Sequence, residues 1–143
     1  MIEGDSNKRN QLSDRDNNVL ADFCRQIRET DSSIMSLTIA DAHGDIISQS
    51  HGTEYEREFL GRAAGVRTKA GAWAALMLGM EYEVDEVFGE TECIVRVHKN
   101  GKLMIVPFPS KKMILVLLTK KQVDSNNVLP KIRPILDSFD RVV

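Results

Sequence analysis

The sequence predicts one α/β domain in which a helix, two strands, a long helix, three strands and a final helix follow one another. The spacing of apolar residues alternates between the helical period of about 3.6 and the strand period of two. Short turns separate the strand-like stretches, which predicts antiparallel neighbours. A length of 143 residues also suits a single domain. We expect a five-stranded, mainly antiparallel sheet with the long helix on one face and the terminal helices on the other.

The first helix is predicted after a polar segment. Residues 1–11 are rich in Asp, Asn, Ser and Lys, so we expect a disordered tail there and a single domain over residues 12–143. Beyond the tail, apolar residues recur at steps of three, four or seven, as on one face of a helix: Leu12, Val19, Leu20, Phe23 and Ile27. The polar run 31–33 is expected to end this helix.

A hairpin is predicted next. Met35, Leu37 and Ile39 alternate with polar residues, as in a strand with one buried face. The following turn, residues 41–44, ends in Gly44, which is free to adopt a positive φ. A second strand begins at Ile46, and the short connection makes the two strands antiparallel.

The segment from Glu54 to Phe88 is predicted to be mainly helical, with Gly61 or Gly65 as the place of any interruption. Strands are expected at 91–98 and 102–108, flanking the dipeptide Asn-Gly that is typical of tight hairpins. The apolar run 113–118 predicts a strand buried on both faces in the middle of the sheet.

The closing helix carries its apolar face on residues 128–139. Asn126 or Asn127 is expected to cap its start. Pro130 suits the first turn, whereas Pro134 is expected to bend the helix or delay its beginning.

The long helix carries the most informative pattern. Apolar residues at alternate steps of four and three form a heptad seam: Val66, Ala70, Trp73, Met77, Met80, Val84 and Val87. No charged residue lies between Lys69 and Glu81, so the middle of the helix is apolar all round and needs cover on every side. A second copy of the helix is the simplest cover, and its Gly and Ala residues would allow close approach. The alternative is that a terminal helix of the same chain covers it.

Charge is distributed unevenly along the same segment. The candidate partner-binding charges are basic at its start and acidic at its end: Arg57, Arg62, Arg67, Glu83, Asp85 and Glu86. Both groups oppose the helix dipole, so helix stability does not explain them. An antiparallel helix pair would bring basic starts against acidic ends. The alternative is two solvated clusters without a partner.

The motifs of common catalytic and metal sites are absent from the sequence. There is no phosphate-binding Gly-x-x-x-x-Gly-Lys loop, no Gly-x-Gly-x-x-Gly and no Gly-x-Ser-x-Gly elbow. Asp41, His43 and Asp45 alternate in a way that suits a metal, but such a turn is more typical of a hydrogen-bonded hairpin corner. We therefore expect no catalytic residue, cofactor or metal.

Composition excludes several other classes. A net charge of −2 gives no basis for nucleic-acid binding. The longest mostly apolar stretch, residues 71–80, is about half the length that spans a bilayer. The polar N-terminus does not resemble a secretory signal, and the two cysteines do not form a Cys-x-x-Cys pair. We expect a cytoplasmic protein with reduced thiols.

Three features resemble the Roadblock/dynein-light-chain family, a profilin-like and longin-related fold, over residues 33–119. The first is the hairpin Leu37-Thr38-Ile39-Ala40-Asp41-Ala42-His43-Gly44-Asp45-Ile46-Ile47-Ser48. The second is the Ala/Gly-rich helix that precedes the third strand, and the third is the strand set 92–97, 102–107 and 113–119.

This resemblance implies a non-catalytic homodimer that scaffolds or regulates Ras-like small GTPases, or that holds motor and signalling complexes together. Such dimers pair their long helices and join the strand after the helix edge to edge. The positions that this implies for the dimer interface, together with those of the seam, are Val66, Ala70, Trp73, Ala74, Met77, Met80, Cys93, Ile94, Val95 and Arg96.

Two other functions stay open at the level of sequence. Related α/β folds can open a pocket between sheet and helix, so a small-molecule sensor is the first alternative. An enzyme whose site is assembled from distant residues is the second. The expected core positions are almost all aliphatic, which disfavours a sensor, and no acid, base and nucleophile stand in a recognisable pattern, which disfavours an enzyme.

Overall fold

The computed structural model describes residues 14–52 and 64–142, which form one antiparallel sheet and its covering helices. The elements in chain order are α2 (Asp14–Thr30), β1 (Ile34–Asp41), β2 (Ile46–His51), α4 (Ala64–Gly79), α5 (Tyr82–Phe88), β3 (Ile94–His98), β4 (Gly101–Pro107), β5 (Met113–Thr119) and α6 (Ser125–Val142). The five strands lie in the order β2-β1-β5-β4-β3, and each pairs antiparallel with its neighbours. The predicted fold class is confirmed, with one additional helix.

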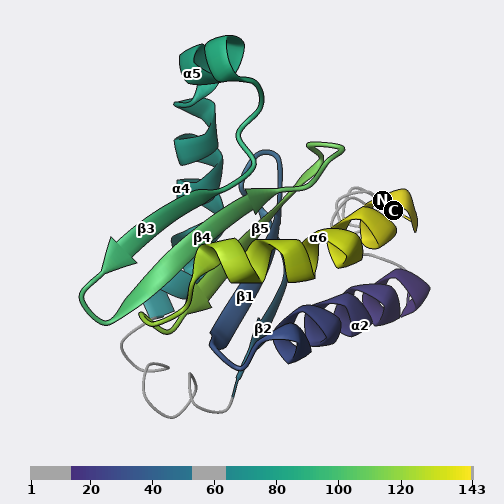
Figure 1. Ribbon diagram of the computed structural model, residues 1–143. Coiled ribbons are helices and arrows are strands. Elements are labelled where there is room, and N and C mark those ends of the chain that lie inside the picture. Colours follow the sequence, from purple (N-terminus) through teal and green to yellow (C-terminus); the bar gives the residue numbers. More distant parts are fainter. Residues whose placement is uncertain (1–13, 53–63, 143) are drawn as a thin grey trace.

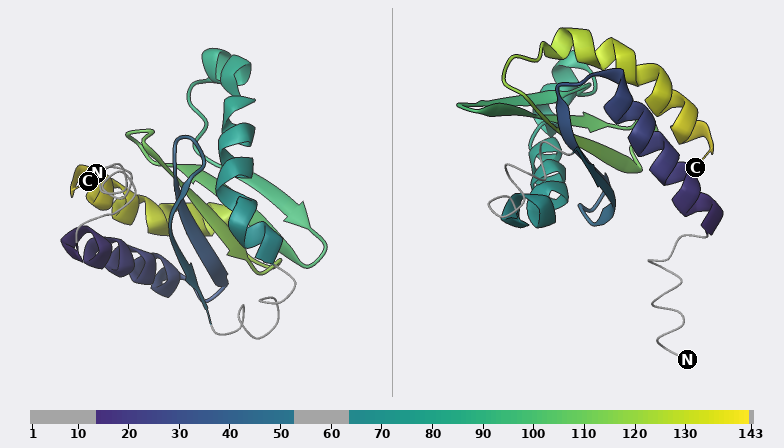
Figure 2. Two further views of the ribbon diagram at one scale, coloured as in Figure 1. Left: turned by 180° about the vertical axis from the view of Figure 1, so that it is seen from behind. Right: turned by 90° about the horizontal axis from the view of Figure 1, so that it is seen from below.

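Three layers result from the alternation of side chains along the strands. The sheet lies between α4 on one face and α2 with α6 on the other (Figure 1, Figure 2). On β4, Leu103 and Ile105 join the core cluster under α4, whereas Met104 and Val106 join the cluster under α2 and α6. The terminal helices therefore do not cover α4, and the alternative in which one of them does so is wrong.

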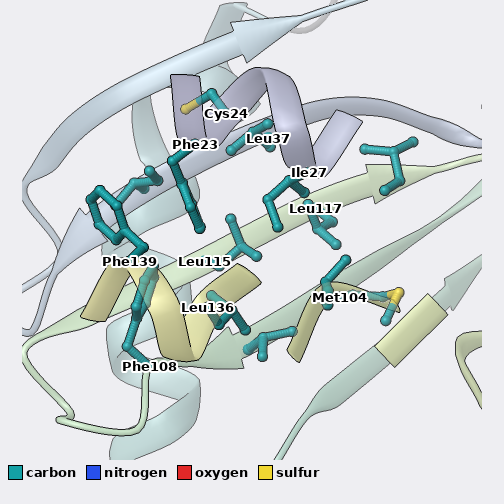
Figure 3. Close-up of a cluster of buried hydrophobic side chains, with 14 of the residues drawn as sticks. Phe23, Cys24, Ile27, Leu37, Met104, Phe108, Leu115, Leu117, Leu136 and Phe139 are labelled. Carbon is teal, nitrogen blue, oxygen red and sulfur yellow. The ribbon is translucent and has the colours of Figure 1, made fainter. Parts of the chain in front are cut away.

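The larger part of the core lies between the sheet and the terminal helices. Phe23 of α2 stacks on Phe139 of α6 with ring centroids 4.4 Å apart, and Phe108 tilts against both rings (Figure 3). Strand β5 runs through the middle of the sheet and is buried along nearly its whole length, as predicted. These three ring contacts thus join the first and last described helices on one face of the sheet.

The predicted single helix from Glu54 to Phe88 is wrong at its C-terminal end. The helix stops after Gly79, and a shorter helix, α5, begins at Tyr82. The amide of Glu81 bonds the carbonyl of Leu78 at 3.1 Å, a tightened turn of the kind that ends helices. Glycine weakens the helix at this point, and no sheet underlies the residues that follow. Gly65 lies inside α4 without interrupting it, and Gly61 lies outside the described residues.

Two element boundaries also differ from expectation. Strand β3 begins at Ile94 rather than Thr91, because the register would place Glu92 opposite Pro107, which has no amide hydrogen to donate. Helix α6 is capped by Asp124 instead of Asn126 or Asn127: the Asp124 carboxylate accepts the amide of Asn126 at 2.9 Å. The helix starts without delay and runs through Pro134, since its apolar face packs against the core.

The first hairpin has the predicted corner. The Asp41 carboxylate accepts the amides of His43 at 2.9 Å and Asp45 at 3.0 Å, and Gly44 has a φ of 94°. The alternating Asp and His residues therefore build a hydrogen-bonded turn. The predicted tail, residues 1–11, lies outside the described residues.

Candidate protein-interaction surface

Exposed apolar side chains concentrate on α4, α5 and β3. We call those on the two helices and on the turn between them the apolar ridge; its members are Trp73, Leu76, Met80, Tyr82, Val84, Val87 and Phe88. Leu76 is 66% exposed and Phe88 is 84% exposed, values far above those of core residues. Strand β3 adds Val95 and Val97. Large contiguous apolar surface of this kind typically marks a site of interaction.

The small residues of α4 explain why its larger ones face outward. Ala70 and Ala74 are buried against the sheet, and Gly71 lies against the β1–β2 corner. A Cβ on Gly71 would come within 2.4 Å of the Gly44 carbonyl oxygen. These residues let α4 approach its own sheet closely, so the predicted contribution of Ala70 and Ala74 to a dimer interface is not available at the surface.

The remaining predicted interface residues of the helix fall at different depths. Trp73 and Met80 are exposed, whereas Met77 is half-buried and its sulfur receives the Arg96 guanidinium at 3.9 Å. Val66 lies in α4, but its side chain is outside the described residues. The exposed stripe thus differs from the predicted seam in that Leu76 takes the place of Met77. It runs from Trp73 through Leu76 to Met80.

Strand β3 forms one edge of the sheet. It pairs with β4 from Ile94 opposite Ile105 to His98 opposite Gly101, and no described strand pairs with its other side. Arg96 lies on the α4 face, opposite Leu103, while Val95 and Val97 lie on the other face. Its unpaired backbone groups can accept a further strand. Just before β3, Cys93 packs half-buried against the core, and burial raises its pKa to about 11.

A groove lies beside α4, over the end of the sheet formed by the β3–β4 hairpin. Its volume is about 830 Å³. Its apolar lining comes from helix and sheet together: Met35, Trp73, Leu76, Met77, Leu103 and Leu118. The hairpin contributes two exposed cationic side chains that we call the hairpin cations, Arg96 and Lys99, and the exposed His98 also lines the groove. The groove is therefore apolar along its floor and basic at its outer end.

Solved structures of similar architecture cover most of the chain. MglB of Myxococcus xanthus has a TM-score of 0.68 at 13% identity, over 92% of each chain. The gliding protein MglB of Thermus thermophilus has a TM-score of 0.73 at 10% identity, over 92% of this chain and 93% of that one. A Roadblock/LC7 domain from Streptomyces avermitilis has a TM-score of 0.60 at 12% identity, over 77% and 85%. The chain has a Roadblock/LC7 fold.

Comparisons of sequence add nothing to this assignment. No protein-family model matches the chain, and no curated protein matches it. The Roadblock/LC7 fold that the hairpin and strand pattern predicted is confirmed, whereas identities of 9–13% in MglB and Roadblock/LC7 structures speak for the fold alone.

Acidic residues gather on the short helix α5 of this Roadblock/LC7 fold. Glu83 and Glu86 are exposed, and neither takes part in an ion pair with another described residue. The Asp85 carboxylate accepts the hydroxyl of Thr91, which links α5 to the segment before β3. Of the predicted basic counterparts, Arg57 and Arg62 are outside the described residues, and so is the side chain of Arg67.

The described residues show few arrangements that are typical of a catalytic or metal-binding site. They contain no group of three or more His, Cys, Asp or Glu side chains placed to hold a metal ion. Ser36 and His51 lie 2.8 Å apart, but Ser36 is buried within the sheet. Burial also raises the pKa of the Cys24 thiol. Among the described helices, none combines the length and the apolar character needed to cross a bilayer.

Several surface residues were missed from sequence. Leu76, Tyr82, Phe88 and Val97 are exposed but lie outside the predicted interface. Leu76 could have been found, because it stands three residues after Trp73 and four before Met80, on one helical face. The α5 residues could not, since a continuous heptad pattern conceals the break after Gly79.

Proposed function

We propose that the chain is a non-catalytic adaptor that acts in the cytoplasm as a homodimer. The exposure of the apolar ridge is the observation that carries this proposal. Leaving several large apolar side chains in water is unfavourable, and burying each against a partner would contribute about 1.5–3 kcal/mol. A second copy is the simplest partner, since most soluble oligomers are closed dimers.

The edge strand supports the same assembly. Antiparallel pairing of β3 with β3 of a second copy would satisfy its unpaired backbone groups and extend the sheet across the dimer. The α4 helices would then lie on the same side of the joined sheet and pack through the apolar ridge. The proposed interface keeps Val66, Trp73, Met77, Met80 and residues 93–96.

The family resemblance supports a protein partner. Roadblock-type dimers scaffold or regulate Ras-like small GTPases, and we propose a partner of that class. The candidate contact residues are the charged ones at both ends of the helical segment: Arg57, Arg62, Arg67, Glu83, Asp85 and Glu86. The adaptor would supply a surface to the GTPase and no nucleotide-binding loop of its own.

Sedimentation tests the dimer. We expect the wild-type chain to sediment as a dimer at tens of micromolar, and the Trp73→Arg variant to sediment as a monomer with unchanged secondary structure. Ile46→Arg is the matched control, because Ile46 is 37% exposed and Trp73 is 38% exposed, but Ile46 lies on β2. A wild-type monomer, or a Trp73→Arg dimer, would contradict the proposed interface.

Affinity capture from the native cell tests the partner. The expected result is a small GTPase that is retained by the wild-type chain and lost with Trp73→Arg. Recovery of no small GTPase by either bait under conditions that preserve the dimer would contradict the GTPase part of the proposal and leave the dimer standing.

The groove favours a small-molecule sensor as the second candidate function. Its volume suits a ligand of modest size, and apolar walls with a few polar groups at one end are typical of binding sites. A thermal-shift screen against metabolites distinguishes the two functions. A compound that raises the melting temperature of the wild-type chain, and not of a Leu103→Trp variant, would support the sensor.

A further inference from the structure

We propose that helix α5 of one protomer lies in the groove of the other protomer, with its apolar side chains on the groove floor and its glutamates against the hairpin cations. This inference rests on the proposed homodimer.

Among the described residues, helix α5 has little support besides the hydrogen bond that Asp85 accepts from Thr91. None of its residues is buried, and it stands clear of the sheet at the end of α4 (Figure 1, Figure 2). Its seven residues are too few for an isolated helix to be stable in water. Its exposed Val84, Val87 and Phe88 need an apolar surface to cover them.

No described residue of the same chain covers the groove. Helix α4 contacts β1 and β5, and leaves the β3–β4 end of the same face open. The chain's own α5 lies at the opposite end of α4: Asp85 and Glu90 lie near Pro107 and Ile114, where β4 ends and β5 begins. The hairpin that borders the groove lies where β4 begins. Helix α5 therefore cannot fill the groove of its own chain.

Antiparallel pairing of two β3 strands brings α5 of the other chain to this place. Such pairing sets the start of one strand beside the end of the other, so Ile94 of one copy lies near His98 of its neighbour. Only residues 89–93 separate α5 from β3, and five residues span at most about 17 Å. Helix α5 of the second copy is thus tethered beside the hairpin cations.

Charge complementarity favours the same arrangement. Glu83 and Glu86 of α5 are exposed and unpaired among the described residues. Arg96 and Lys99 are also exposed and free of ion pairs with described residues. The two groups carry opposite signs and meet twice in a symmetric dimer. If the two chains instead paired in parallel, the α5 glutamates of one copy would face the α5 glutamates of the other, and the hairpin cations would face each other. Both contacts would be repulsive.

Complementary charge reversal tests this contact. In Glu83→Lys/Glu86→Lys homodimers two cationic surfaces meet, and in Arg96→Glu/Lys99→Glu homodimers two anionic surfaces meet. We expect each homodimer to be weakened about tenfold, because the reversal acts at two contacts per dimer. In the mixed dimer one contact is native and the other has both signs reversed, so both are attractive. An equimolar mixture should therefore form the heterodimer in preference to either homodimer, as measured by native mass spectrometry.

Controls separate this inference from the proposed dimer. Glu29→Lys and Lys112→Glu change exposed charges away from the contact, and should leave dimerisation unchanged. Phe88→Ser should weaken the dimer without loss of folding, because Phe88 is exposed in the single chain. Tight charge-reversed homodimers that mix statistically would overturn the α5 contact but retain the dimer. A monomeric wild-type chain would overturn the proposed function itself. A metabolite that binds the groove of the intact dimer would also overturn the α5 contact.

Discussion

Asp31 shows how one side chain joins three segments of the chain. Its carboxylate accepts the Ser33 amide at 2.8 Å and the Ser33 hydroxyl at 2.6 Å, just after α2 ends. The Lys131 ammonium of α6 lies 3.4 Å from its second oxygen. The Ser33 hydroxyl, the Ser33 amide and then Lys131 hold the pKa of Asp31 below its usual value. Each of these contacts favours the charged carboxylate.

This residue should contribute to the pH dependence of stability. Because the pKa is lower in the folded chain than in the unfolded chain, the stabilisation is present above about pH 4 and is lost as the pH falls further. We expect Asp31→Asn to lower the free energy of unfolding by about 1 kcal/mol at pH 7, through weaker hydrogen bonds, and to have a smaller effect at pH 3. Urea unfolding at both values measures this.

The matched control for Asp31→Asn is Asp137→Asn, which removes an exposed carboxylate from α6. Its free energy of unfolding should follow that of the wild-type chain at both pH values. An equal loss at pH 3 and pH 7 in Asp31→Asn would mean that the charge of Asp31 does not contribute.

At the scale of elements, α4 contains two glycines in opposite environments. Gly71 lies against the β1–β2 corner, where a Cβ would be 2.4 Å from the Gly44 carbonyl oxygen and 2.9 Å from the Ala40 Cβ. Gly79 has no atom within 4 Å of the position that a Cβ would take. The first glycine sets how closely the helix approaches the sheet, and the second weakens the helix where it ends.

The same substitution should therefore have opposite effects at the two positions. Gly71→Ala should lower the free energy of unfolding by about 1–3 kcal/mol, because helix and hairpin must move apart. Gly79→Ala should raise it by about 0.5–1 kcal/mol, because alanine favours the helix and meets no obstacle. Chemical denaturation of the two variants measures both changes. A neutral Gly71→Ala would mean that α4 does not pack closely on Gly44.

At the scale of the whole molecule, the terminal helices and α4 differ in how completely they are covered. Helices α2 and α6 bury one face against the sheet and expose polar residues on the other. Helix α4 buries small residues and exposes large apolar ones. On the side of α2 and α6, the apolar face of each helix is thus covered by the sheet. On the side of α4, large apolar side chains stay exposed, and this surface suits assembly.

If assembly completes this surface, thermal stability must depend on concentration. A 100-fold rise in protein concentration should stabilise a two-state dimer by about 2.7 kcal/mol, and raise its melting temperature by roughly 5–10 °C in a chain of this size. The Trp73→Arg variant should melt at a temperature that does not depend on concentration. Calorimetry at two concentrations measures this difference. A wild-type melting temperature independent of concentration would contradict the proposed dimer.

The sequence by itself determined the order of the elements other than α5, and the place of β5 in the sheet. Periods of two and 3.6, turn dipeptides and the continuous apolar run 113–118 are local signals, and each is read without knowledge of distant residues. The same signals predicted the Asp41 corner, and the hairpin, helix and strand motifs resemble the Roadblock family, whose fold the structure has. Local patterns of this kind report the backbone conformation directly.

Only the tertiary structure decided which side of α4 faces the sheet and where the long helix ends. Ala70, Gly71 and Ala74 could in principle have faced a second helix or the chain's own sheet, because small residues permit close approach in either case. The nearness of Gly44, 27 positions earlier in the sequence, settles the choice. In the same way, the heptad pattern continues through Val87, but the sheet does not extend beneath the residues of α5, none of which is buried. A pattern shows that a helix face must be covered, whereas the element that covers it depends on contacts between residues far apart in the chain.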